Sequence, residues 1–159
     1  MTLVFLQGEH ILYSELKAIN SSEFVMYAAD TENTWINCNG IGSFTFYNVS
    51  QVEISSLVFV GCGENTLKVI SLLSVYNSVF QGYSDSGAAF LLFYTTANII
   101  SSSFVSNTGT YRYPLDDFFF QGDEYKQIGG AIAAYQSKVW ITACSFYGNN
   151  AEVGGALFH

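Results

Sequence analysis

The sequence predicts an all-β fold, a right-handed parallel β-helix (a solenoid) of about six coils with one long loop insertion. Three observations predict it. Half of the 159 residues are hydrophobic and 17% are aromatic, but only 11% are charged, against about 25% in typical domains. Short apolar stretches alternate with polar residues, as in strands, and no stretch keeps a sustained 3.6-residue period. A motif recurs at intervals within the range of about 20 to 50 residues that is typical of repeat architectures.

The repeat is clearest when the chain is aligned on four phenylalanines, each preceded by apolar residues seven and five positions earlier. These are Phe59, Phe80, Phe104 and Phe146. The first two intervals between them are each one repeat long, and the last is nearly twice as long because of an insertion at about residues 108–128. A second recurring position lies at a fixed offset before each Phe, and Ala156 would be its next occurrence. It falls at Phe44, Asn65, Ala89 and Ala131.

Each repeat is expected to form one coil, because a single coil cannot bury its own apolar face and stacking does. Crossovers between parallel strands are almost always right-handed. The four phenylalanines are predicted to stack in the core. Asn107 and Asn149, three positions after a Phe, are predicted to bond turn backbone and the next coil. The pairs Gly129–Gly130 and Gly154–Gly155 are predicted to form tight turns with positive φ.

The remaining stretches fit the repeat more loosely. Residues 3–6, 10–13, 24–27 and 34–38 are strand-like, with polar turns between them. Residues 67–73 are the best helical candidate, but their Ser, Val and Ile content favours a strand. We therefore expect few helices.

The net charge of −8 argues against binding to nucleic acid or anionic lipid, because both require basic patches. The five Lys and Arg residues are scattered along the chain. No stretch has the roughly 18 apolar residues of a membrane span. No cysteine spacing indicates zinc, and no cofactor motif occurs, so we expect neither metal nor cofactor.

Two short motifs resemble a known family. Phe104–Asn107 and Phe146–Asn149 (Phe-x-x-Asn), with Gly129–Ile132 and Gly154–Leu157 (Gly-Gly-Ala-Ile/Leu), look like the repeats of chlamydial polymorphic outer-membrane proteins. Those are autotransporter-like surface adhesins with a β-helix passenger, and similar repeats occur in large pectin-lyase-like surface proteins. The resemblance implies a secreted or cell-surface location and supports the architecture more than a function.

We expect one domain over residues 1–159, as a fragment of a longer chain. Residues 1–6 are apolar but lack the basic start of a signal peptide. The sequence stops within a repeat, so neighbouring β-helix coils of the same longer chain are expected partners.

The insertion is the most distinctive local feature, because long loops in compact repeats often carry function. It combines carboxylates with aromatic residues that anchor protein or glycan partners. The binding candidates are Tyr111, Tyr113, Asp116, Asp117, Phe118, Phe119 and Phe120. Asp116 and Asp117 are also the alternative catalytic pair for glycoside cleavage. The plain alternative is that the three phenylalanines fold back on the coils.

Three smaller features remain open. Cys38 and Cys62 lie one coil apart and are either a disulfide or two buried thiols. Cys144 is expected to be a buried free thiol. Asn20 and Asn48 begin N-glycosylation sequons, which chance also produces in a chain rich in Asn and Ser.

The hypothesis is a non-enzymatic structural or adhesive segment of an extracellular protein that presents loops to an unknown protein or glycan. The alternative is a carbohydrate-active enzyme, a polysaccharide lyase or glycoside hydrolase that uses the acidic residues of the insertion.

Overall fold

The computed structural model describes residues 1–30, 34–63, 66–82, 88–109, 112–113, 126–127, 129–151 and 154–158, and these residues contain strands but no helix. In chain order the strands are β1 (Thr2–Phe5), β2 (Gly8–Ile11), β3 (Glu15–Ile19), β4 (Glu23–Ala28), β5 (Thr34–Asn37), β6 (Ser43–Ser55), β7 (Val58–Val60), β8 (Leu67–Tyr76), β9 (Val79–Gln81), β10 (Phe90–Phe93), β11 (Thr96–Ile100), β12 (Ser103–Val105), β13 (Arg112–Tyr113), β14 (Lys126–Gln127), β15 (Ile132–Tyr135), β16 (Lys138–Thr142), β17 (Ser145–Tyr147) and β18 (Leu157–Phe158).

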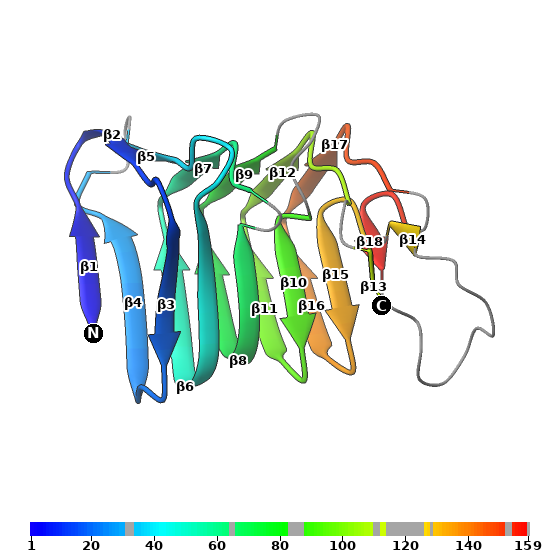
Figure 1. Ribbon diagram of the computed structural model, residues 1–159, viewed down its shortest axis with the longest axis horizontal. Helices are drawn as coiled ribbons and strands as arrows, with labels where there is room; N and C mark the ends of the chain where they lie inside the picture. The colour runs from blue at the N-terminus through cyan, green and yellow to red at the C-terminus, as the bar shows by residue number, and fades with distance from the viewer. Residues whose placement is uncertain are drawn as a thin grey trace.

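The strands pair into three parallel ladders that run along one column (Figure 1). The first ladder contains β1, β4, the end of β6, the end of β8, β11 and β16. The second contains β2, β5, β7, β9, β12 and β17. The third contains β3, the start of β6, the start of β8, β10, β15 and β18. Because β6 and β8 bend, each contributes to two ladders.

Each turn of the chain contributes one strand to each of the three ladders in order. The next turn adds a strand beside each of these, so the protein is a parallel β-solenoid. In Figure 1 the third ladder descends in front of the first, which gives the right-handed winding expected of parallel crossovers. We expected about six coils. The structure instead has about four turns, although six strands of the described residues form the second ladder.

The core is a continuous column of aromatic and aliphatic side chains inside the three ladders. Phe59, Phe80, Phe104 and Phe146 occupy one register position, and their rings are stacked with centroids 4.9, 5.3 and 5.0 Å apart. Phe90 packs edge-on against Phe80 at 4.5 Å. The spacing of stacked rings matches the strand spacing of about 4.8 Å, so every added coil extends the stack.

Two rows of interior polar side chains join the coils at their corners. The Ser102 hydroxyl donates to the carbonyl of Ile100 at 3.0 Å and accepts from the backbone N–H of Ser78 at 3.2 Å. Thr95 behaves in the same way, donating to Phe93 at 2.9 Å, while its N–H donates to the Ser137 hydroxyl at 3.0 Å. These buried hydroxyls satisfy corner backbone groups that the ladders leave unpaired.

Asn107 and Asn149 form a third interior row, which also bonds backbone groups at a corner. Asn107 is 1% exposed, and its amide nitrogen donates to the Phe80 carbonyl at 3.0 Å and to Asn149 Oδ1 at 2.9 Å. Asn149 in turn donates to the Phe104 carbonyl at 2.9 Å. Each amide therefore bonds both to its own stack and to the backbone of the preceding coil.

The corners use left-handed backbone at single residues. Ser56, Asn77, Ser101 and Ala143 follow strands of the first ladder and have φ between 48° and 59°. The backbone N–H of Asn77 donates to Ile100 in the next coil at 3.1 Å. Asn and Ser are tolerated there because their short polar side chains fit the left-handed region.

The glycine pairs differ from the expectation. Gly129 and Gly154 have positive φ, 55° and 66°, but Gly130 and Gly155 do not. A Cβ on Gly130 would lie 2.0 Å from the carbonyl oxygen of Gly155, so this glycine permits close approach of two coils. Gly155 has room for a side chain.

The second recurring position is correct for three of its predicted members. Ala89, Ala131 and Ala156 lie on one rung series, because the N–H of Ala131 donates to Ala156 at 2.9 Å and the N–H of Phe90 to Ala131. Phe44 does not share this series, since it pairs with Leu67 and Leu67 with Phe90. Asn65 lies outside the described residues. The turns before the third ladder vary in length, which a fixed offset cannot follow.

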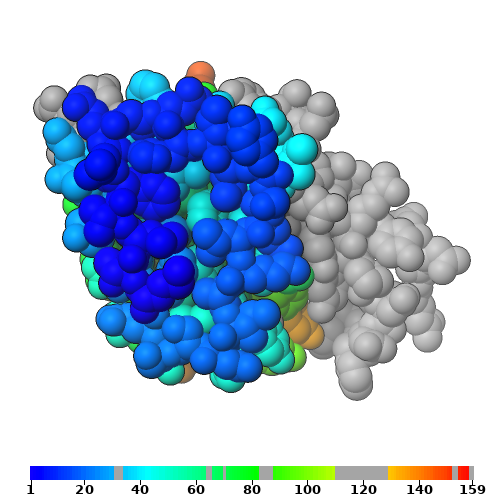
Figure 2. All heavy atoms as spheres, turned by 60° about the vertical axis from the view of Figure 1, so that its left-hand side comes forward, coloured from blue at the N-terminus to red at the C-terminus, as the bar shows by residue number. Residues whose placement is uncertain are grey.

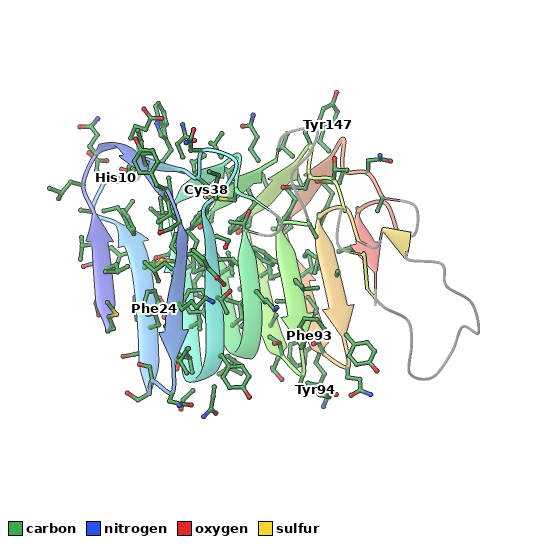
Figure 3. The ribbon with its side chains drawn as sticks, in the orientation of Figure 1. His10, Phe24, Cys38, Phe93, Tyr94 and Tyr147 are labelled. Atoms are coloured by element: carbon green, nitrogen blue, oxygen red, sulfur yellow. A yellow bond between two sulfur atoms is a disulfide. The ribbon has the colours of Figure 1, made fainter. Side chains whose placement is uncertain are left out.

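The phenylalanine stack yields a stability prediction. Phe80→Ala removes a buried ring that touches rings on both sides, so we expect the free energy of unfolding to fall by about 3–5 kcal/mol. Denaturant unfolding followed by circular dichroism measures it. Tyr147→Ala is the control, because this aromatic residue lies in the same ladder and is 76% exposed (Figure 3). Equal losses in the two variants would contradict the stacked core.

Candidate functional site

Most of the predicted insertion site lies outside the described residues. This applies to Tyr111, Asp116, Asp117 and the three phenylalanines 118–120. The backbone of Tyr113 is described, in the two-residue strand β13, which pairs antiparallel with β14. The insertion therefore leaves the column between β12 and β15 and begins and ends in a short antiparallel ribbon.

A polar groove lies elsewhere, on the outer side of the third ladder. It has a volume of about 650 Å³. Its floor comes from the outward side chains of β3, β6 and β8, and its walls from the corner segments beside them. The lining residues are Tyr13, Ser14, Glu15, Lys17, Gly40, Ile41, Ser43, Thr45, Gly63 and Lys68.

The floor of the groove is set by strand register. Lys17, Thr45 and Lys68 occupy one register position in three successive strands, so they form a row along the column. Their neighbours Leu67 and Phe44 point inward and are buried. The alternation of a strand therefore fixes which side chains reach the groove.

Glu15 lies beside this row, two residues before Lys17 on the same strand. Lys17 Nζ is 2.9 Å from a Glu15 carboxylate oxygen, and the Thr45 hydroxyl donates to the other oxygen. The Thr45 hydrogen bond, followed by that from Lys17, lowers the pKa of Glu15 below its usual range. Among the described residues no ion pair involves Lys68, and its charge also contributes to the lowered pKa of Glu15.

The rim of the groove is tied to a disulfide. Cys38 and Cys62, with Cα atoms 4.4 Å apart, are bonded to each other in neighbouring coils. Figure 3 shows Cys38 at the corner above the groove strands. The rim residues Gly40 and Gly63 follow these cysteines closely, and their N–H groups donate to Gly61 at 2.8 Å and Gly42 at 3.0 Å. The disulfide therefore holds both segments that form this wall.

Gly42 is required by the same corner. A Cβ on Gly42 would lie 2.6 Å from the carbonyl oxygen of Leu12 in the preceding coil. Its N–H donates to Cys38 at 2.7 Å. The N–H of Gly63 in the following coil donates to the Gly42 carbonyl at 3.0 Å, so three coils meet behind the rim and the groove wall is part of the column.

The groove has the chemistry of a binding site for an anionic, hydroxyl-rich ligand. Two ammonium groups, hydroxyl side chains and the exposed ring of Tyr13 face one hollow. Lysine binds anionic oxygens as a point charge. Within the described part of the chain, no group of three or more His, Cys, Asp or Glu side chains is placed to hold a metal ion.

Sequence reasoning missed this groove. The signal was present, because Lys17, Thr45 and Lys68 follow one another at intervals close to one coil. It was hidden because the N-terminal coils lack the Phe-x-x-Asn motif on which the alignment rested. His10, which begins the strand-like stretch 10–13, lies in β2 at the phenylalanine position of the first coil.

The sequon residues Asn20 and Asn48 lie on one exposed corner. Both have positive φ, 53° and 52°, and Asn48 Nδ2 donates to Asn20 Oδ1 at 2.8 Å. The pair therefore repeats, on the outside of the column, the amide stacking seen inside it. Both side chains are exposed.

A row of aromatic residues lies along the third ladder, at the edge where Asn20 and Asn48 also lie. Tyr47 lies in β6, and Phe93, two coils further on, pairs in register with Tyr135 at a ring-centroid distance of 6.3 Å. Tyr94, 66% exposed, meets Tyr135 edge-on at 6.2 Å. Figure 3 shows Phe93 and Tyr94 at this edge, at the bottom of the view. The row is a second outward surface on the same side of the solenoid as the groove.

Comparison with known proteins found no matching protein-family model, no matching curated protein and no matching solved structure. No helix long and apolar enough to cross a membrane occurs in the described ranges.

The disulfide yields a second prediction. Replacing Cys38 and Cys62 together by Ser opens a 24-residue cross-link, and we expect unfolding to become easier by roughly 3 kcal/mol. In unfolded protein prepared without reductant, a thiol reagent should modify Cys144 alone. Modification of all three cysteines would contradict the bond. Cys144→Ser is the matched control and should leave the cross-link intact.

Proposed function

We propose that the protein is a non-enzymatic structural or adhesive β-solenoid of a secreted or cell-surface protein, and that its groove binds a glycan carrying carboxylate or sulfate groups. The single observation that supports this most is the row of Lys17, Thr45 and Lys68 on the floor of the groove. The chain as a whole carries a net charge of −8, so an anion is attracted locally and repelled elsewhere.

The polar groups favour a sugar over an apolar ligand. Hydroxyl side chains and glycine backbone line most of the groove, and both exchange hydrogen bonds with sugar hydroxyls. Tyr13 offers an exposed ring at the margin, on which the C–H face of a sugar can lie. Because the strands hold the backbone of these residues in fixed register, binding requires ordering of the lysine side chains but not of the main chain.

Three features support an extracellular setting. A disulfide between adjacent coils suits an oxidising compartment. The low content of charged residues and the exposed sequons are typical of secreted proteins. The Phe-x-x-Asn and Gly-Gly-Ala motifs resemble the repeats of chlamydial surface adhesins, and this resemblance implies a cell-surface location.

The groove favours binding over turnover. Among its described lining residues there is one carboxylate, Glu15, whose pKa is lowered by Thr45 and Lys17, so these residues do not include the acid and base pair of a glycosidase. The alternative enzyme would use Asp116 and Asp117 of the insertion, which lie outside the described residues.

The test compares matched oligosaccharides by calorimetry. Oligosaccharides with uronate or sulfate groups should bind, and neutral ones of equal length should bind more weakly. Lys68→Ala should weaken binding about 10- to 100-fold, because a charge-assisted contact is lost. Lys138→Ala is the control, since this lysine is exposed on β16, outside the groove.

Two results would contradict the proposal. One is equal affinity of the Lys68→Ala and Lys138→Ala variants for the charged oligosaccharides. The other is cleavage of any of these oligosaccharides that disappears in the Asp116→Asn, Asp117→Asn double variant, which would establish the enzyme instead.

A further inference from the structure

The groove already contains an anionic group of its own, the carboxylate of Glu15. Lys17 Nζ lies 2.9 Å from one carboxylate oxygen, and the Thr45 hydroxyl donates to the other. Both partners are binding groups of the groove, because Lys17 and Thr45 are in register on its floor. The Glu15 carboxylate therefore occupies contacts that an acidic group of a ligand would otherwise make.

The two lysines of the floor differ in their pairing. Lys17 forms an ion pair with Glu15, while among the described residues no ion pair involves Lys68. The Thr45 hydrogen bond and then Lys17 lower the pKa of Glu15 most, and the charge of Lys68 is the smallest of the causes. Glu15 therefore neutralises one lysine by direct contact and affects the other only over a longer distance.

The row extends over three successive coils. Lys17, Thr45 and Lys68 come from β3, β6 and β8, and Figure 2 shows the first of these coils, in blue, at the front of the column. The strand register places the two lysines two rungs apart, which is about 9.6 Å along the column. A ligand that contacts both lysines therefore lies parallel to the column axis and carries acidic groups at a spacing of that order.

We propose that Glu15 determines the specificity of the groove, by competing with the ligand for Lys17 and Thr45. A ligand with one acidic group binds at Lys68 and leaves the contacts of Glu15 in place. A ligand with two acidic groups at the right spacing binds Lys68 with one and displaces the Glu15 carboxylate with the other. This inference rests on the proposed function, because it requires that the groove binds an anionic glycan.

The position of Glu15 explains why a single acidic group cannot displace it. Glu15 is two residues from Lys17 on the same strand, so its carboxylate is always at high effective concentration beside the lysine. An acidic group that is free in solution has no such advantage, and it would exchange one lysine–carboxylate contact for another of the same kind. A second acidic group gains the same advantage once Lys68 has bound the first.

The competition is expected to be modest, because both partners of the ion pair are partly exposed. The side chains of Lys17 and Glu15 are 55% and 37% exposed, and solvent-exposed ion pairs are weak. Removing the competitor should therefore tighten the binding of a ligand with two acidic groups by about 2- to 5-fold. Glu15 adjusts selectivity in this way without closing the groove.

The test measures the affinity of the Glu15→Gln variant by calorimetry with two oligosaccharides of equal length, one carrying two sulfate groups and the other carrying one. Gln keeps the size of the side chain but has no charge to pair with Lys17. The variant should bind the doubly sulfated compound about 2- to 5-fold more tightly than the unmodified chain does, and the singly sulfated compound with little change. Equal or lower affinity for the doubly sulfated compound overturns the proposal.

A double-mutant cycle separates competition from simple repulsion. In a Lys17→Ala background, Glu15→Gln should have little effect, because the contact for which Glu15 competes is already gone. Equal tightening in both backgrounds would mean that Glu15 only repels the ligand through its charge, and this contradicts the proposal. Glu53→Gln is the matched control and should leave both affinities unchanged. It makes the same charge change on the outer side of the first ladder, in register with Val25 and Ser74.

The same measurements distinguish failure of this inference from failure of the proposed function. If Lys68→Ala weakens the binding of both sulfated compounds while Glu15→Gln changes neither affinity, the groove binds an anionic ligand but Glu15 does not determine its specificity. If neither the unmodified chain nor the Glu15→Gln variant binds a sulfated compound, both proposals are overturned. Circular dichroism should show every variant folded, because the changed side chains lie outside the core.

Discussion

The fold depends on one constraint, the repetition of register from coil to coil. Each inward side chain lies on the side chain of the same position in the next coil, as in the stack from Phe59 to Phe146. The same register places the Asn107 amide against Asn149 and the Ser78 N–H against the Ser102 hydroxyl. No coil can satisfy its own core or corners, so stability is shared between neighbours and falls at the ends.

That constraint leaves the outward positions free, and the candidate site is built from them. Lys17, Thr45 and Lys68 lie outside the core, and the strands bring them into one row. The Cys38–Cys62 disulfide then fixes the corner segments that wall the groove. Binding groups on such a column gain order from the coils beneath them, which suits recognition of an extended partner better than chemistry at a single atom.

The strands of the repeat could be predicted because inward residues recur at fixed spacing. Val52, Leu73, Ala97 and Val139 do share one ladder position, and residues 67–73 do form a strand. The first coils were harder, because Ile36 and His10 replace phenylalanine in the stack. The groove could not be predicted from motifs, since outward residues are not constrained by packing. The glycine pairs were predicted only half correctly. Gly130 is needed because two coils approach closely there, and the sequence does not distinguish that need from a need for positive φ.

Residue-resolved amide hydrogen exchange tests the central claim most directly. Coil-to-coil dependence predicts the slowest exchange in the middle of the column, at amides such as Val79 and Ser103, which donate to the preceding coil at 2.9 Å. Exchange should become faster toward β1–β3 and toward β16–β18. Uniform exchange along the column, or strongest protection in the first coil, would contradict the account.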